Sequence, residues 1–328
     1  IIGATSGDTG SAAIHALAGR AGVDVFMLHP KGRVSDVQRR QMTTVLAPNI
    51  HNIAIEGTFD DGQALVKAMF GDADFAGRFA LSAVNSINWA RLMAQIVYYF
   101  YAAVRLGAPD RAISFSVPTG NFGDVFAGYA AARMGLPVKR LVVATNENDI
   151  LHRALSGGDY SAGTVQPTDS PSMDIQVSSN FERLLFDLAG RDGTTTAAWM
   201  ASFEATKRLV LPESARAEAA QIFASARIDG TEMAGALRWA REACGQIIDP
   251  HTAIGLAAAQ MQPGDEPMVT LATAHPAKFR DAVERACGVR PPQPESVGHL
   301  FQREERYSVL PADLATIEGW IAERAQPA

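Results

Sequence analysis

The stretch from Ser116 to Gly128 joins a buried strand to an alanine-rich helix through a loop that contains two glycines. Residues 112–117 are apolar or small at every position, which is typical of a strand covered on both faces of its sheet. Residues 124–134 then predict a helix. The loop between the strand and the helix consists of Thr119, Gly120, Asn121, Phe122 and Gly123.

This loop has the features of a site for an anion. The first turn of a helix presents backbone N–H groups without partners inside the helix, and the helix dipole adds partial positive charge. We expect Gly120 and Gly123 to adopt positive φ and to let a phosphate approach the backbone. The alternative is a tight turn that binds nothing, because glycine-rich turns between strands and helices are common in this class of fold.

A second junction of the same kind opens the chain. A short strand leads into residues 5–10, and residues 11–20 predict a helix. Capping that helix requires one polar side chain, but four hydroxyl or carboxyl groups lie within five positions. We therefore favour a ligand-binding loop over a simple helix cap. The spacing of its glycines differs from that of a dinucleotide-binding fingerprint. The four side chains belong to Thr5, Ser6, Asp8 and Thr9.

Strands and helices alternate along much of the chain, which predicts an α/β fold of two parallel-sheet domains flanked by helices. We expect a smaller domain at residues 1–108 and a larger one at 109–328. A helical insertion is predicted at about 151–245, since 197–207, 212–225 and 231–244 each have a helical pattern. The tail from residue 290 onward predicts a linker and a terminal helix.

A polar segment leads into the long helix that begins near residue 89. Asn85, Ser86, Asn88 and Arg91 precede or open this helix. The planar fork of an arginine matches a phosphate or a carboxylate. The alternative is a helix cap followed by a surface arginine.

Composition narrows the class of partner. The net charge is −6 with no basic stripe, which argues against nucleic acid as a partner. The longest apolar stretch is too short to span a bilayer. Cys244 and Cys287 form no metal or redox motif, so we expect a cytoplasmic protein. Because the chain opens inside a strand and without Met, we also expect residues before Ile1.

Five motifs occur in sequence order: ATSGDTG at 4–10, NSIN at 85–88, GNFGD at 120–124, DPHT at 249–252 and ATAHPAKF at 272–279. Together they resemble the threonine synthases of the longer bacterial and fungal type, over nearly the whole chain. The resemblance implies the fold of the tryptophan-synthase β subunit. It also implies pyridoxal 5'-phosphate as cofactor.

The resemblance assigns a role to each motif. Gly120, Asn121, Phe122 and Gly123 match the loop for the cofactor's phosphate. Ser6, Gly7, Asp8 and Thr9 match the loop that holds the substrate carboxylate, and Asp8 is expected to face the cofactor. Asn85, Ser86 and Arg91 match residues that contact the substrate and its phosphate. Thr273 matches the residue that meets the pyridine nitrogen.

The implied activity is that of a lyase in threonine biosynthesis, which converts O-phosphohomoserine and water to L-threonine and phosphate. The family's Schiff-base lysine lies upstream of the first glycine loop, so we expect it before Ile1. The five lysines of this chain lie outside the matching motif: Lys31, Lys67, Lys139, Lys207 and Lys278.

Three other functions stay open at this stage. A threonine dehydratase-like lyase would share the fold but would not need phosphate donors such as Arg91. A protein that has lost the lysine would be an inert binding protein of the same fold. A nucleotide-dependent oxidoreductase is less consistent, because neither glycine loop has the required spacing. The sequence does not indicate whether the protein is a monomer or a homo-oligomer.

Overall fold

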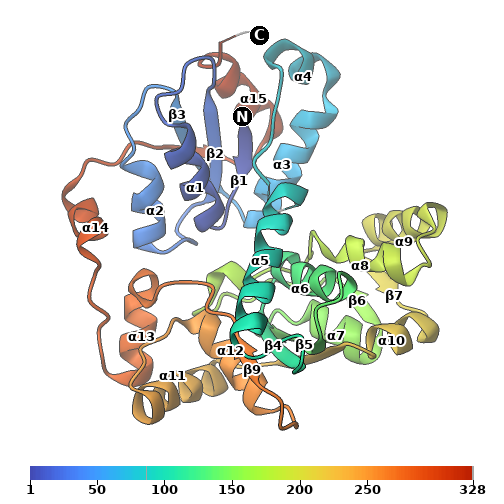
Figure 1. The fold of residues 1–328 in the computed structure, drawn as a ribbon. Helices are drawn as coiled ribbons and strands as arrows, with labels where there is room; N and C mark the ends of the chain where they lie inside the picture. Colours follow the sequence, from blue (N-terminus) through green and yellow to red (C-terminus); the bar gives the residue numbers. More distant parts are fainter. Residues whose placement is uncertain (86, 327–328) are drawn as a thin grey trace. The chain divides into compact units, whose positions relative to one another are not determined.

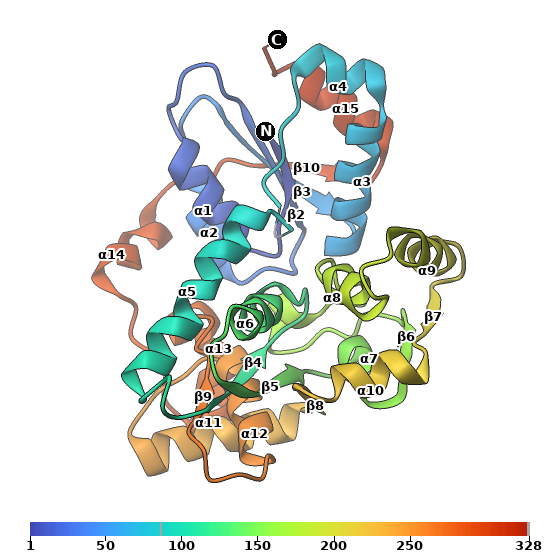
Figure 2. The same ribbon diagram turned by 45° about the vertical axis from the view of Figure 1, so that its right-hand side comes forward.

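The computed structural model describes residues 1–85 and 87–326, which form two compact units (Figures 1 and 2). Unit 1 combines Ile1–Asn85 with the described residues from Pro292 onward, and unit 2 holds the described residues between them. Each unit contains a parallel four-stranded sheet, as the alternating sequence pattern predicts. No helix among the described residues combines the length and apolar character needed to cross a bilayer.

In unit 1 the sheet has the order β1-β2-β3-β10, and helices cover both of its faces (Figure 1). Alternate residues of β2 explain this, because successive side chains of a strand point to opposite faces. Phe26 and Leu28 pack with α3 and α15, whereas Val25 and Met27 pack with α1 and α2. The strands are β1 (Ile2–Ala4), β2 (Val25–Pro30), β3 (Ile50–Glu56) and β10 (Ser308–Pro311), and the main helices are α1 (Asp8–Leu17), α2 (Asp36–Thr43), α3 (Phe59–Gly71), α4 (Ala73–Phe79) and α15 (Leu314–Ala322).

In unit 2 the sheet has the order β8-β5-β4-β9. Leu141 and Val143 of β5 share a core with α6 and α8, whereas Val142 and Ala144 pack with α11 and α12. The strands are β4 (Ile113–Pro118), β5 (Val138–Thr145), β8 (Phe223–Arg227) and β9 (Met268–Thr270), beside a small β6 (Asp159–Ser161) and β7 (Arg208–Val210) pair. The helices include α5 (Trp89–Arg105), α6 (Gly123–Arg133), α7 (Ile150–Gly157), α8 (Phe181–Leu188), α9 (Gly193–Thr206), α10 (Glu213–Ala219), α11 (Gly230–Cys244), α12 (Pro250–Gln260) and α13 (Arg280–Cys287).

The domain boundaries differ from the predicted division at residue 108. Helix α5 belongs to unit 2, where its buried face, including Tyr99 and Ala103, packs into the core with α6. The tail belongs to unit 1, because Ser308–Pro311 forms the edge strand β10 and pairs in parallel with Ile53–Glu56 of β3. Both assignments depend on contacts between segments that are far apart in the sequence.

The predicted helical insertion also contains a strand of the main sheet. Residues 212–225 were expected to be helical, but α10 ends at Ala219 and Phe223–Arg227 forms β8. This strand pairs with Leu141–Thr145 of β5. Its alanine-rich sequence has little intrinsic preference for a strand, so pairing with β5 overrides local propensity.

Candidate cofactor and substrate site

The loop from Thr119 to Gly123 joins β4 to α6, as predicted, and short internal hydrogen bonds fix its shape. Thr119 Oγ1 accepts from the Phe122 N–H at 3.0 Å, and Asn121 Oδ1 accepts from the Gly123 N–H at 3.0 Å. The next two amides, of Asp124 and of the residue after it, have no acceptor inside helix α6. The loop therefore presents a helix N-terminus held in one conformation.

The positive φ in this loop belongs to Phe122, at 64°, and not to Gly120 or Gly123 as expected. Phe122 is fully buried, with its ring 5.3 Å from that of Phe181 and 5.9 Å from that of Phe223. A left-handed conformation is costly for a bulky residue. Packing of the ring, together with the two hydrogen bonds of the loop, holds the backbone there.

The two glycines matter for close approach. A Cβ on Gly120 would lie 3.0 Å from Ile175 Cδ1 and 3.2 Å from Met173 Cα. A Cβ on Gly123 would lie 3.3 Å from both Asn121 Oδ1 and Asn180 Nδ2. Because even one carbon crowds both positions, a larger residue at either one would displace the loop or its neighbours.

The segment over Gly120 is anchored by the DPHT motif at the start of α12. Asp249, which is fully buried, accepts from the His251 N–H and pairs with His251 Nδ1 at 2.8 Å. His251 Nε2 in turn accepts from the Ser172 N–H at 3.2 Å. In this arrangement Nδ1 donates to Asp249 and Nε2 accepts from Ser172. The motif therefore caps α12 and also holds Met173 against the Thr119–Gly123 loop.

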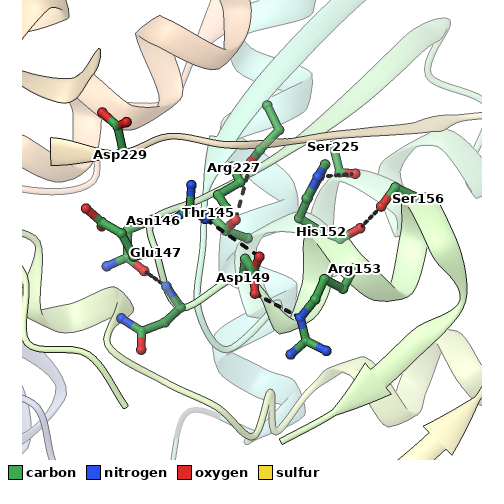
Figure 3. Close-up of polar contacts among 12 residues, drawn as sticks. Thr145, Asn146, Glu147, Asp149, His152, Arg153, Ser156, Ser225, Arg227 and Asp229 are labelled. Atoms are coloured by element: carbon green, nitrogen blue, oxygen red, sulfur yellow. Dashed lines mark hydrogen bonds and ion pairs between the residues drawn. The ribbon is translucent and has the colours of Figure 1, made fainter. Parts of the chain in front are cut away.

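A network of hydrogen bonds orders residues 168–174, the segment that contains Met173. Asn146 Nδ2 donates to Thr168 Oγ1, Ser170 Oγ and Asp174 Oδ1 at 2.8–2.9 Å. Figure 3 shows Asn146 beside Glu147 and Asp149 at the end of β5, and Asp149 accepts from Arg153. The sequence gives no sign of this network, because its members lie up to 28 residues apart.

Asp124, in the first turn of α6, is held by Tyr99. The Tyr99 hydroxyl donates to the Asp124 carbonyl at 2.7 Å and to its Oδ1 at 3.2 Å. Burial raises the pKa of Asp124 to about 6, although the hydrogen bond from Tyr99 opposes the shift. Because of its burial, this carboxyl is easier to protonate than an exposed aspartate.

Arg91 has an unsatisfied donor, which supports its predicted role. Its Nη1 atom is buried and has no hydrogen-bond partner among the described residues. Burial lowers the pKa of Arg91, and no described carboxylate forms an ion pair with it. A half-buried guanidinium without an anion is costly, so the site fits a negatively charged ligand. Asn88 Oδ1 caps the same helix by accepting from the Ala90 N–H at 3.0 Å, whereas Ser86 lies outside the described residues.

In unit 1 the loop at the start of α1 is organised by Thr5. Thr5 Oγ1 accepts from the N–H groups of Gly7 and Gly10, both at 2.9 Å. Gly7 has a φ of 140° and provides no side chain to cap the helix. Thr5 therefore shapes the loop, while the half-buried side chains of Ser6 and Thr9 make no hydrogen bond to the described residues. That leaves their hydroxyls available for a ligand.

Asp8 and Asn85, the remaining predicted residues of unit 1, are both half-buried. Gln38 Nε2 donates to Asp8 Oδ1 at 3.2 Å. Gln38 is itself fixed in a capping box with Ser35 at the start of α2. The only signal of Gln38 in the sequence is a Ser-x-x-Gln spacing, which predicts a helix start and no contact with Asp8.

Thr273 lies three residues beyond the end of β9 at Thr270. It is exposed, and the following short helix is capped by His275, whose Nδ1 accepts from the Ala277 N–H at 3.1 Å. Thr273 is therefore not the cap, and its hydroxyl is accessible at the end of the strand, where α/β sheets bind ligands.

Comparison with known proteins identifies the class of protein to which this chain belongs. A family model described as "Pyridoxal-phosphate dependent enzyme" matches residues 1–228, and one described as "Threonine synthase, C-terminal" matches residues 252–321. The chain is a member of the pyridoxal-phosphate-dependent enzymes. Its cofactor is therefore pyridoxal phosphate.

Individual relatives narrow the class. The chain is 55% identical to the threonine synthase of Pseudomonas aeruginosa over 326 residues, covering 98% of this chain and 70% of that one. It is 44% identical to the Saccharomyces cerevisiae threonine synthase over 307 residues, covering 87% and 60%. The crystal structure of pyridoxal-phosphate-bound threonine synthase from Brucella melitensis superposes with a TM-score of 0.90 at 51% identity, covering 99% and 70%. The chain belongs to the threonine synthase family.

Proposed function

We propose that this chain provides the cofactor-phosphate loop and the substrate-binding residues of an enzyme that converts O-phosphohomoserine and water to L-threonine and phosphate. The observation that carries the proposal is the buried Nη1 of Arg91, which has no hydrogen-bond partner among the described residues. A substrate that carries a phosphate supplies the missing acceptor, and a bidentate arginine matches it well.

Different segments of the chain would bind the cofactor and the substrate. The Thr119–Gly123 loop and the N-terminus of α6 would hold the cofactor's phosphate, and Thr273 would meet its pyridine nitrogen. When bound, pyridoxal phosphate stores the electron pair left after the α proton departs. The N-terminus of α1, with Ser6 and Thr9, would bind the substrate carboxylate. Arg91 would bind the phosphate as it leaves and stabilise its charge.

A dehydratase-like activity is the second candidate, and Arg91 argues against it. An unphosphorylated hydroxy amino acid provides no anion for a second cationic site. The two candidates also differ in product, because a dehydratase releases ammonia and a 2-oxo acid.

Substrate comparison in the full-length protein tests the role of Arg91. Losing a charged contact to a buried partner typically costs about 2–5 kcal/mol. In Arg91→Ala we therefore expect a large rise in KM for O-phosphohomoserine and little change in the binding of an unphosphorylated amino acid. Arg105→Ala, an exposed arginine of the same helix, is the matched control. Equal losses for both ligands would show that Arg91 is structural.

We also propose that the protein acts in the cytoplasm and binds no nucleic acid. The supporting observations are the free Cys244 and Cys287 and the net charge of −6.

A further inference from the structure

We infer that Asn180 and Arg183 form a link that positions the segment Ile87–Arg91 relative to the cofactor-phosphate loop. The link would transmit cofactor binding to the residues that receive the substrate's phosphate. This role rests on the proposed function, because Arg91 is given its ligand there. Both are positioning residues, since they act through the loop and through the segment.

Asn180 provides the contact with the loop. It is fully buried, and both its backbone N–H and its Nδ2 donate to the Asn121 carbonyl, at 3.0 and 3.2 Å. A Cβ added to Gly123 would lie 3.3 Å from the same Nδ2. One side chain therefore holds the loop's backbone and borders the space that Gly123 leaves open.

Arg183 provides the contact with the segment. Its Nε donates to Asn180 Oδ1 at 3.2 Å, and its Nη2 donates to the Ile87 carbonyl at 2.6 Å. Its guanidinium also lies over the Trp89 ring, 5.7 Å from the centroid. A single planar group thus contacts Asn180 on one side and the residues just before Arg91 on the other.

The link has a rigid base. Asn180 is the N-cap residue of α8 and Arg183 lies in its first turn. Phe181 between them is fully buried, with its ring 5.3 Å from that of Phe122 and 4.9 Å from that of Tyr160. A displacement of the phosphate loop therefore meets packed aromatic rings as well as hydrogen bonds.

The segment has no comparable support from burial. Ile87 and Trp89 are 41% and 45% exposed, so few apolar contacts hold them. A segment with few buried contacts opens at low free-energy cost, so the bonds from Arg183 add to the cap from Asn88 in ordering it. This makes the segment sensitive to whatever fixes Asn180.

Hydrogen exchange with pyridoxal phosphate alone tests the link. In the full-length wild-type protein we expect the cofactor to slow exchange in two peptides, residues 87–92 and 119–125. In Arg183→Met the second peptide should still be protected, while protection of the first falls about tenfold, within the usual range of coupling between sites. Arg191→Met is the control and should behave as wild type, because Arg191 is exposed in the turn after α8 and pairs with Asp187 of that helix.

Three results would overturn the inference: no cofactor-dependent protection of residues 87–92 in wild type, equal protection in Arg183→Met, or the same loss in Arg191→Met. If Arg183→Met does not fold, Arg183→Lys decides, because it keeps the charge but cannot make both bonds. It should show a partial loss, and wild-type protection would contradict the link.

Kinetics provide a second readout. Arg183→Met should raise KM for O-phosphohomoserine about tenfold with a smaller effect on kcat, and Arg183→Lys should restore part of it. A change in kcat alone would contradict the positioning role. The exchange measurement requires no substrate, so it tests the link independently of the reaction. If the protein releases no phosphate but the exchange result is as expected, the proposed function is wrong and the link still holds.

Discussion

Replacing Gly120 with alanine should weaken the binding of pyridoxal phosphate through its phosphate group. The new Cβ would lie 3.0 Å from Ile175 Cδ1 and 3.2 Å from Met173 Cα. The Ile175 side chain can change rotamer, but the Met173 contact is with a backbone atom. That backbone cannot move freely, because the neighbouring Ser172 N–H donates to His251 at 3.2 Å. The phosphate loop must therefore yield by a few tenths of an ångström, and its amides move with it.

The cost can be placed within limits. Overpacking in a well-packed site typically costs about 1–3 kcal/mol. If most of this strain appears only when the loop must close on a phosphate, affinity falls about 5- to 150-fold. Gly120→Val, with two more methyl groups, should abolish binding.

Spectroscopic titration of the full-length protein with pyridoxal phosphate and with pyridoxal gives the measurement. Gly120→Ala should lose affinity for the phosphorylated ligand and keep most of its affinity for pyridoxal. Gly193→Ala is the matched control, because nothing lies within 4 Å of a Cβ at that position. Wild-type affinity for pyridoxal phosphate in Gly120→Ala, or equal losses for both ligands, would refute the reasoning.

Two further predictions concern protonation. Burial raises the pKa of Asp124 from 3.8 to about 6, so its contribution favours folding most at low pH and is lost as pH rises from about 4 to 6. In Asp124→Asn the pH dependence of the unfolding free energy should differ from wild type by about 3 kcal/mol across this window, as measured by urea unfolding, and parallel profiles would contradict it. Thr273 offers an uncharged hydroxyl, which cannot hold a proton on the pyridine nitrogen as a carboxylate would. Nitrogen NMR of labelled cofactor should show an unprotonated nitrogen in wild type and a protonated one in Thr273→Asp, and a protonated nitrogen in wild type would argue against this contact.

Local sequence patterns were enough to predict the parallel sheets and both glycine loops. Buried strands and glycine-rich helix starts are set by residues close together in the chain, and the loops at residues 5–10 and 119–123 lie where those patterns end. The cap of α12 is equally local, because Asp249 accepts from backbone amides two and three residues away.

The features that the sequence could not provide depend on distant partners. Strand β10 pairs with β3 across about 250 residues, and β8 is a strand only because β5 lies beside it. The left-handed backbone of Phe122 follows from aromatic packing and not from its residue type. The sequence therefore suggested positive φ at the glycines of this loop and not at Phe122. Gln38 and Asn180 have no local signal of function, since each acts on a loop that is remote in the chain.

The products formed by the full-length protein from O-phosphohomoserine, with pyridoxal phosphate bound, decide the proposed function. We expect L-threonine and inorganic phosphate in equal amounts, both dependent on Arg91. Release of ammonia and a 2-oxo acid, or release of phosphate without threonine, would contradict the proposal.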